Sequence, residues 1–257
     1  MRRMKPLVEL TLTPAADAAA QAGPHFSEVR PGLRSDGLEA RSHLLLTALR
    51  LFSQTGFAKT STREIAQAAG VNLAAIRYYF GDKAGLYRAV FTEPQGMPCD
   101  DIARFAPRHL SLREALAGFI AGFIEPLKMG DLSQQMTRLH FREMLEPTGL
   151  WAEQIDNSIK PSHAALLTVL ARHLGIALLP EGLDANAAAD DDLHRLAFSI
   201  TGLAIQMFIS RDVMDSVRPS LVGSHAAIDQ WSERLVDHAE ALVECERARR
   251  QAQLQAG

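Results

Sequence analysis

The sequence lacks the cysteine patterns and the long apolar runs that mark secreted and membrane proteins. Its two cysteines, Cys99 and Cys245, form neither a CxxC motif nor a disulfide framework. A reducing cytoplasm is therefore the expected compartment. The longest apolar stretch, residues 115–124, is about half as long as a membrane helix, so we expect no membrane partner.

Signatures of enzymes are also missing. The sequence contains no G-x-S-x-G elbow and no P-loop. Its nine histidines include no H-x-x-x-H or H-E-x-x-H spacing, the patterns by which one helix brings two imidazoles to a metal ion. We therefore expect no catalytic residues, no metal site and no cofactor.

Positive and negative charges nearly balance overall, but they are unevenly distributed. The net charge is −3, yet residues 38–97 hold seven Lys and Arg against four Asp and Glu, which is +3 and leaves −6 for the rest. A cationic module on an acidic body is typical of a DNA-binding protein, because phosphates are neutralised locally. Double-stranded DNA is thus the expected partner of this module.

Residues 60–83 have the pattern of two short helices around a tight turn. Ser61 and Glu64 are spaced as a capping box, which starts the first helix. Gly70 suits a left-handed C-cap, and Asn72 can cap the second helix. This pattern predicts a helix-turn-helix, whose second helix enters the major groove of DNA. The predicted helices span residues 62–69 and 73–80, within a helix-turn-helix of residues 61–80.

Three regions follow one another along the chain. We expect residues 1–37, interrupted by Pro and Gly, to form a flexible N-terminal tail. Residues 38–97 should form a DNA-binding domain of three to four helices, and residues 98–257 a larger helical domain. No segment shows convincing strand alternation, so the predicted fold class is all-α. The other predicted helices span residues 39–55, 83–93, 112–128, 132–145, 149–173, 191–213 and 224–253, with a loop at 182–192.

The outward face of the second short helix supplies the candidate DNA contacts. At 100° per residue Ile76 and Phe80 point to one side, with Leu73 near them, so the opposite side is free. Small alanines there let the backbone approach base edges, arginine can bind guanine or phosphate, and hydroxyl or ammonium groups can bind phosphates. A solvated charge, a core position and a cap are the structural alternatives for individual members. The candidates are Thr60, Ser61, Thr62, Asn72, Ala74, Ala75, Arg77, Tyr78, Tyr79 and Lys83.

Residues 44–91 resemble the N-terminal domain of the TetR family of transcriptional regulators. The resemblance is carried by Leu51-Phe52, Gly56-Phe57, residues 60–66 and 69–71, Tyr78-Tyr79-Phe80, and Lys83 with Leu86. The family often has an aromatic residue where Arg77 stands, so a phosphate contact at that place must come from Arg77, Tyr78 or Tyr79. The resemblance implies a DNA-binding transcriptional regulator and not an enzyme. A twofold dimer of such a regulator should bind a palindromic operator.

The C-terminal part is similar to the TetR subgroup that includes the regulator of cefoperazone and chloramphenicol sensitivity. The similar stretches are residues 72–76, residues 141–144 followed by Glu146-Pro147, Lys160-Pro161, and residues 197–200. The resemblance implies an all-helical effector domain, a homodimer formed by the last two long helices, and repression relieved by a small molecule. Residues 197–209, apolar nearly all round, separately predict a helix buried on two sides and hence a dimer.

Apolar and aromatic residues of the C-terminal part are the candidates for an effector pocket, since they form adaptable walls. Ordinary core packing is the alternative for each of them. For the whole chain, the alternative is a helical small-molecule-binding or enzymatic protein that retains the N-terminal module for packing only. The pocket candidates are Phe119, Phe123, Met136, His140, Met144, Trp151 and Met207.

Overall fold

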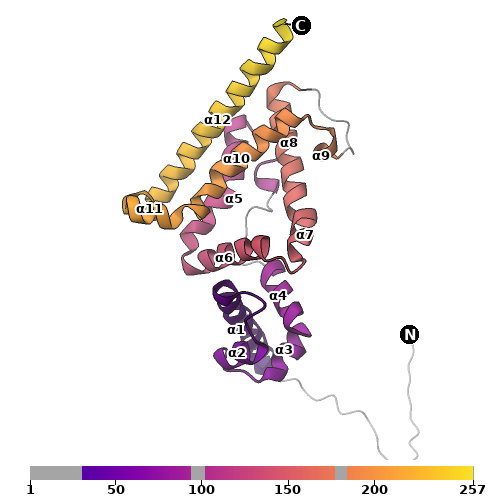
Figure 1. Cartoon of the computed structure of the whole chain (residues 1–257), viewed down its shortest axis with the longest axis vertical. Helices are drawn as coiled ribbons and strands as arrows, with labels where there is room; N and C mark the ends of the chain where they lie inside the picture. The colour runs from indigo at the N-terminus through magenta and orange to yellow at the C-terminus, as the bar shows by residue number, and fades with distance from the viewer. Residues whose placement is uncertain (1–30, 94–101, 177–183, 257) are drawn as a thin grey trace, which may run out of the picture.

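A smaller group of helices at one end and a larger helical body at the other make up the structure (Figure 1). This computed structural model describes residues 31–93, 102–176 and 184–256, and these residues contain no strand. The predicted all-α class is confirmed. The expected flexibility of residues 1–30 falls outside the described residues.

The helices at the smaller end are α1 (Pro31–Thr55), α2 (Thr62–Ala68), α3 (Leu73–Phe80) and α4 (Lys83–Thr92). The larger end begins with the turn η2 (Ile102–Arg104), α5 (Leu112–Ile124), the turn η3 (Glu125–Met129) and α6 (Asp131–Leu145). It continues with α7 (Leu150–Gln154), the π-helical turn η4 (Ile155–Ile159), α8 (Lys160–Leu174) and α9 (Ala185–Ala188). The last elements are α10 (Asp191–Ile209), α11 (Arg211–Val217), the turn η5 (Pro219–Leu221) and α12 (His225–Ala256).

The helix-turn-helix forms by the predicted caps. The Ser61 hydroxyl accepts a hydrogen bond from the Glu64 amide at 3.1 Å, and the Glu64 carboxylate accepts one from the Ser61 amide at 3.5 Å. Gly70 takes a φ of 65° in the turn, and the Asn72 side chain accepts a bond from the Ala74 amide at 2.8 Å. These local bonds satisfy amides that helix starts would otherwise leave unpaired.

Two hydrophobic cores divide the molecule, and α6 belongs to the boundary between them. The first core joins buried residues of α1–α4, such as Phe52 and Leu86, to Met136 and Leu139 of α6. The second core is built from α5, α8, α10 and α12. Figure 1 shows α6 lying across the body where it meets the smaller domain. Helix α6 is therefore shared by the smaller domain and the body.

The body is closed by the 32-residue helix α12, which packs along α5 and α10. On one side of this helix, Leu235 and Val243 are almost completely buried. Near its end, the Arg250 guanidinium donates two hydrogen bonds of 2.8 Å to the carboxylate of Asp190, the residue that caps α10. This contact pins the far end of α12 to the start of α10.

Two elements begin where the sequence predicted irregular chain. Helix α1 starts at Pro31 instead of Glu39, in the region assigned to the tail, and proline suits a first helical turn because its missing N–H needs no partner there. Helix α9 occupies part of the predicted loop at residues 182–192, with the Asp184 side chain accepting a bond from the Asn186 amide at 3.0 Å.

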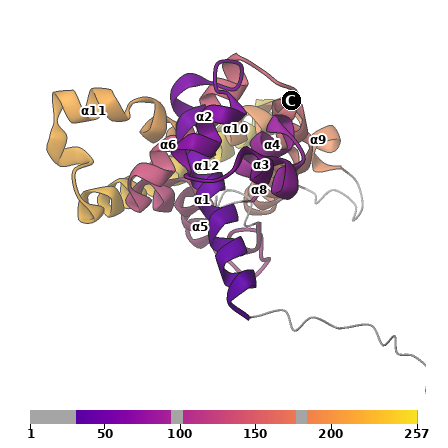
Figure 2. The ribbon, with the colours of Figure 1, turned by 90° about the horizontal axis from the view of Figure 1, so that it is seen from below.

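Three predicted long helices are each divided. Helix α5 ends at Ile124 and passes into η3 because Pro126 has no amide hydrogen to continue the ladder. The segment predicted as 149–173 contains the π-helical turn η4. Helix α10 bends by 62° into α11, which projects sideways in Figure 2. The break falls at Ser210, with no proline or glycine there to mark it, so the sequence does not reveal it.

No described helix is, by itself, both long and apolar enough to cross a bilayer, although the bent pair α10 and α11 passes that test when taken together.

Candidate DNA-binding surface and effector pocket

Helix α3 presents one face outward and one face inward, largely as predicted. Ile76 is 2% exposed and holds the helix to the first core, whereas Tyr78 is 82% exposed. Ala74 and Arg77 are also exposed. Leu73 was expected near Ile76 on the inner side, but it is 50% exposed because it is the first helical residue and lies beyond the part of α3 that packs on the core.

Ala75 and Tyr79 lie at the edge of the outward face and are half-buried. The Tyr79 ring packs edge-on against Tyr78, with 4.9 Å between the ring centroids. Ser61 and Asn72 are exposed at the starts of α2 and α3, and Thr62 is half-buried beside Ser61. The predicted contacts other than Thr60 and Lys83 therefore gather around α3 and the two helix N-termini.

Thr60 belongs to the fold and not to this surface. It is 1% exposed, and its hydroxyl donates to the Gly56 carbonyl at 2.7 Å while lying 2.7 Å from the Thr55 hydroxyl. Its neighbours Ser61 and Thr62 have similar side chains, so sequence alone could not separate a buried bond from an exposed donor. The prediction of Thr60 as a DNA contact is corrected for this reason.

Lys83 lies at the start of α4, where its ammonium sits 4.4 Å from the centre of the Phe57 ring. Partial burial lowers the pKa of this ammonium. The cation–π contact holds the Lys83 side chain against the domain surface, and the ammonium keeps its positive charge there. Lys83 therefore remains a cation at the surface, half-covered by an aromatic ring.

The close packing of α4 on the end of α3 depends on a glycine. A Cβ atom at Gly85 would lie 2.0 Å from the Phe80 carbonyl oxygen. The Asp82 side chain caps α4 by accepting a bond from the Gly85 amide at 2.7 Å. Because no side chain intervenes, the backbone of α4 directly supports the C-terminal end of α3.

An ion pair that sequence reasoning missed ties the middle of α1 to the end of α4. The Arg41 guanidinium donates to the Glu93 carboxylate at 2.6 and 2.5 Å and lies 4.9 Å from the centre of the Phe80 ring. The hydrogen bonds raise the pKa of Arg41 and lower that of Glu93. The two residues are far apart in the sequence, so only the fold brings them together.

The inner face of α6 contains a buried carboxylate. Glu143 is 0% exposed and accepts hydrogen bonds from the Tyr87 hydroxyl at 3.0 Å, the Thr148 amide at 2.8 Å and the Trp151 amide at 3.2 Å. The Thr148 hydroxyl donates to it as well. Burial, and then the charge of Glu143, raise the pKa of Tyr87, which favours a protonated donor. This network joins α4 to α6 and α7.

Arg142, the neighbour of Glu143, makes a second link across the junction. Its side chain donates to the carbonyls of Ser53 at 3.0 Å and Gln54 at 2.8 Å, in the last turn of α1. A cation suits this position because the C-terminus of a helix carries partial negative charge and unpaired carbonyls. Helix α6 thus contacts the first domain through an apolar face, a carboxylate and a guanidinium.

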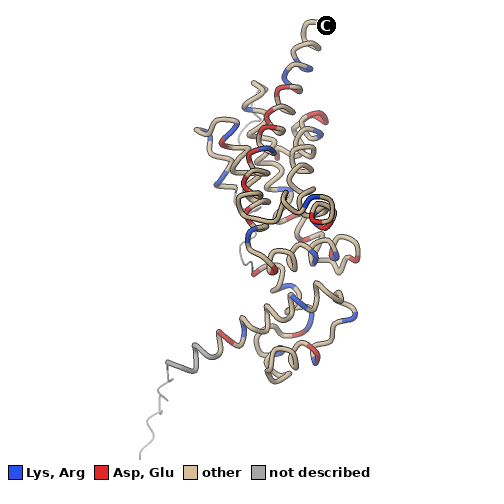
Figure 3. Tube along the Cα trace, turned by 90° about the vertical axis from the view of Figure 1, so that its left-hand side faces the viewer, with Lys and Arg blue, Asp and Glu red and all other residues tan. Residues whose placement is uncertain are grey.

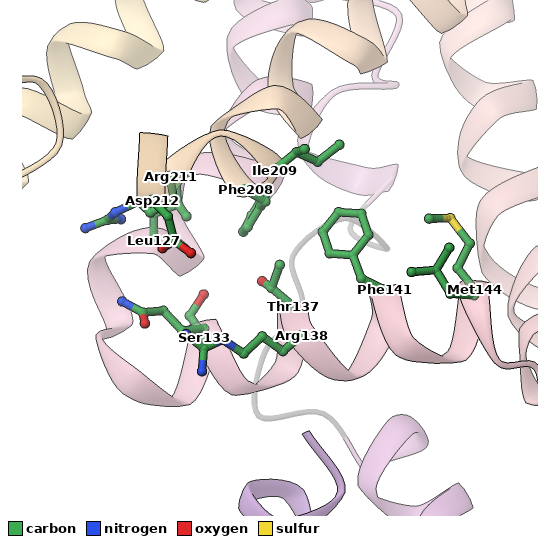
Figure 4. Close-up of a pocket in the computed structure, with 12 residues that line it drawn as sticks. Leu127, Ser133, Thr137, Arg138, Phe141, Met144, Phe208, Ile209, Arg211 and Asp212 are labelled. Atoms are coloured by element: carbon green, nitrogen blue, oxygen red, sulfur yellow. The ribbon is translucent and has the colours of Figure 1, made fainter. Parts of the chain in front are cut away.

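The opposite face of α6 lines a pocket of about 450 Å³, a size in the range of small-molecule sites. Figure 4 shows the side chains of Thr137, Phe141 and Phe208 extending into the space between α6 and the end of α10. The lining residues are Leu127, Ser133, Gln134, Thr137, Arg138, Phe141, Met144, Leu145, Phe208, Ile209, Arg211 and Asp212.

Only Met144 among the predicted pocket residues lines this pocket. Phe119 and Met207 are buried in the second core, with half-buried Phe123 packed against it, while Met136 is buried in the first core. His140 contacts the Met136 carbonyl at 2.8 Å and packs edge-on against Phe91, and the Trp151 amide bonds to Glu143. Apolar composition does not distinguish a core from a pocket wall. The polar members Ser133 and Thr137 were missed because hydroxyls recur throughout the sequence.

The charge pattern follows the division into two parts. Figure 3 shows lysines and arginines spread over the smaller domain and acidic positions recurring along α12. Within the described residues no group of three or more His, Cys, Asp or Glu is placed to hold a metal ion. The surface around α3 is thus suited to a polyanion by its charge and by its exposed donors.

A capped helix-turn-helix on a helical body with a pocket defines a DNA-binding transcriptional regulator. The family model for bacterial regulatory proteins of the tetR family matches residues 44–90. The model for the C-terminal domain of the HTH-type transcriptional dual regulator CecR matches residues 112–244. This chain belongs to the TetR family of transcriptional regulators, in the group of CecR.

Similarity to individual proteins agrees with this assignment. CecR of Shigella flexneri is 33% identical over 156 residues, covering 56% of this chain and 69% of that protein. The regulator AcrR of the same organism is 47% identical over 58 residues, covering 23% of this chain and 27% of AcrR. These relatives are transcriptional regulators, so the enzymatic alternative is not supported.

Solved structures confirm the fold alone, since their sequence identities are low. The hemolysin II transcriptional regulator HlyIIR superimposes with a TM-score of 0.53 at 18% identity, covering 79% of this chain and 97% of HlyIIR. A TetR-like regulator from Rhodococcus sp. RHA1 gives a TM-score of 0.51 at 18% identity, covering 81% and 96% of the two chains.

Proposed function

We propose that this protein is a homodimeric repressor that binds a palindromic operator and is released from it by a small molecule. The arrangement of α6 is the observation that carries this proposal. One face of α6 is buried with the DNA-binding domain and the other lines the pocket. A ligand that favours a different position of α6 would shift the population of dimers whose recognition helices fit the operator.

The proposed DNA contacts come from α3 and the helix starts beside it. Arg77 and Tyr78 are the exposed residues best placed to reach base edges and phosphates. The exposed methyl group of Ala74 leaves room for close approach of the backbone, and Lys83 adds a phosphate contact at the start of α4. Asn72 and Ser61 use one oxygen each for capping, so their proposed contacts use the remaining polar groups.

The proposed dimer uses the outward face of α10. Phe198 is 62% exposed on this helix. One turn further along, a Cβ atom at Gly202 would meet nothing within 4 Å. An exposed aromatic ring with an open glycine beside it is suited to close contact with a second copy.

Selection of DNA sequences by the purified full-length protein tests the proposal. We expect enrichment of a palindrome whose half-sites lie roughly 34–36 Å apart or at a multiple of that spacing. Arg77→Ala should weaken binding about 10- to 100-fold, as loss of a bidentate base contact does. Tyr78→Ala combined with Lys83→Ala should flatten the salt dependence, by about one unit of slope for each lost phosphate contact. Arg218→Ala, an exposed arginine remote from α3, serves as the charge-matched control.

Absence of an enriched palindrome, or equal effects of Arg77→Ala and Arg218→Ala, would contradict the proposed DNA-binding surface. Sedimentation of the protein as a monomer at micromolar concentration would contradict the dimer. CecR is described as a dual regulator, so transcription from a reporter carrying the selected operator determines the sign of regulation. Repression in the absence of effector is the expected result.

A further inference from the structure

One wall of the pocket is formed by polar side chains of α6. Ser133, Gln134, Thr137 and Arg138 lie on successive turns of α6 and all line the pocket. Within residues 31–93, 102–176 and 184–256, their side chains form no hydrogen bond and no ion pair with one another or with other side chains. Polar side chains that converge on one wall of a mainly apolar pocket are suited to bind a polar ligand group.

The remaining walls are mainly apolar. Phe208 and Ile209 at the end of α10 face the α6 wall, and Phe141 and Met144 extend that apolar surface along α6. Figure 4 shows the Phe141 ring and Phe208 on either side of Thr137. Two phenyl rings with flexible apolar side chains fit a flat, apolar ligand body. The pocket is therefore divided into an apolar zone and a donor zone.

The charges of the pocket favour an anion in the donor zone. The pocket lining contains two arginines, Arg138 and Arg211, and one carboxylate, Asp212. Arg211 adjoins Asp212 in α11 and also donates to the Val222 carbonyl at 3.1 Å, with Asp215 at 3.7 Å. Arg211 therefore offsets Asp212 at the α11 end. Arg138 is exposed to the pocket without a carboxylate of its own among the described residues.

We propose that the effector is an amphipathic carboxylate, with a flat apolar body between Phe141 and Phe208 and its carboxylate on Arg138. A planar guanidinium binds a carboxylate through two parallel hydrogen bonds, and a hydroxyl such as that of Thr137 can donate a further one. This inference rests on the proposed function in one respect, namely that the pocket is the effector site. It adds the chemical class of the ligand, which the apolar lining alone leaves open.

Calorimetric titration of the protein without DNA, using three compounds with one apolar body, tests this assignment. The compounds are 1-naphthylacetate, the neutral 1-naphthylacetamide and the cationic 1-(1-naphthyl)ethylamine. We expect the acid to bind about tenfold more tightly than the amide, because a hydrogen bond between charged groups is stronger than a neutral one. Arg138→Gln should abolish this preference, so that the acid binds no more tightly than the amide. Arg63→Gln, an exposed arginine of α2 outside the pocket, should preserve the preference.

Equal affinity for acid and amide, tightest binding of the amine, or no binding of any compound would overturn the carboxylate assignment. Retention of the acid preference in Arg138→Gln would overturn the role of Arg138. Binding is measured without DNA, so failure of the proposed function has a separate signature. In that case the acid binds through Arg138 but does not change affinity for the selected operator.

Discussion

Side-chain caps start helices in both regions, but the capped helices of the DNA-binding domain are short, whereas α5 and α10 of the body bury long apolar stripes. Helices α2, α3 and α4 are 7, 8 and 10 residues long and start at Ser61, Asn72 and Asp82, whose side chains all accept a backbone hydrogen bond. Helices of this length are marginal in isolation. The caps and one small core therefore determine this domain, while packing over long distances determines the body.

Helix α6 takes part in both arrangements, and this teaches how a change in the body can reach the DNA-binding domain. Leu139 and Glu143 face the first domain, while Thr137 and Phe141 line the pocket. Packed interiors respond to local displacement as units because they contain little free space. A ligand against one face of α6 thus acts on a helix whose other face is fixed to α1 and α4.

The largest expected effect is on stability, and it comes from truncating one side chain on each face of α6 in separate variants. Leu139→Ala removes a side chain that is 0% exposed in the first core, so we expect a loss of about 2–5 kcal/mol in the free energy of unfolding. Phe141→Ala truncates a half-buried side chain of the pocket wall, and we expect a loss of about 1 kcal/mol in the free energy of unfolding. Denaturant unfolding of both variants measures the difference. Equal losses would show that the two faces of α6 are not distinct.

A clash introduced into each region gives the next effect. A Cβ atom at Gly85 would lie 2.0 Å from the Phe80 carbonyl oxygen, and one at Gly118 would lie 2.4 Å from the Arg104 carbonyl oxygen. Each change to alanine should cost about 1–3 kcal/mol of stability. Only Gly85→Ala should also lower operator affinity of the folded protein, because it displaces α3. If Gly118→Ala lowered operator affinity and Gly85→Ala did not, the expected difference between the two regions would be contradicted.

The two arginines of α6 sharpen the comparison further. Arg142→Gln removes charged donors from the Ser53 and Gln54 carbonyls, and about 1 kcal/mol of stability should be lost. Arg138→Gln, on the pocket face of the same helix, should change stability by less than about 0.5 kcal/mol. Thermal unfolding of both variants provides the test. A larger loss from Arg138→Gln would reverse the assigned roles.

The smallest expected effect depends on pH and concerns the body alone. A hydrogen bond from Arg250 lowers the pKa of Asp190 from 3.8 to about 2. A lowered folded-state pKa stabilises the protein above the unfolded pKa, and this contribution is lost as pH falls from about 4 towards 2. Asp190 is half-exposed, so solvent screening limits the effect to a few tenths of a kcal/mol. Asp190→Asn retains a capping side chain and should differ from the parent less at about pH 3 than at about pH 6.

Thermal unfolding at the two pH values checks this effect, and salt should reduce it because the pair is near the surface. A difference that grows on acidification would contradict the sign. Operator affinity should not change, since Asp190 and Arg250 lie in the part of the body that packs α10 on α12.

The DNA-binding domain was predictable from sequence because its signals are local. Helix α2 begins at the capping box of Ser61 and Glu64, and α3 begins after Asn72. Each cap bonds to a residue only a few positions away in the sequence. Thr60 shows the limit of such reasoning, because burial of its hydroxyl depends on α1. The link between Arg41 and Glu93 was likewise absent from the sequence pattern, since only the packing of α1 on α4 creates it.

The pocket was not predictable, because it depends on which side of α6 meets which neighbour. Met136 and Met144 lie two turns apart on α6, yet the first is buried with α1–α4 and the second lines the pocket. Their chemistry is the same, and only the direction of each side chain separates them. The bend between α10 and α11, which places Phe208 and Ile209 against α6, is likewise set by tertiary contacts.

Filling the pocket from within tests the role of α6 most directly. Thr137→Trp places a large ring between Phe141 and Phe208, where the effector is proposed to bind, and Thr168→Trp places the same ring on the exposed face of α8. Operator affinity is measured for both variants by DNA titration without any effector. We predict that Thr137→Trp lowers affinity by about tenfold or more, a coupling free energy of roughly 1–3 kcal/mol, while Thr168→Trp leaves it unchanged. Unchanged affinity in a folded Thr137→Trp protein would contradict the account.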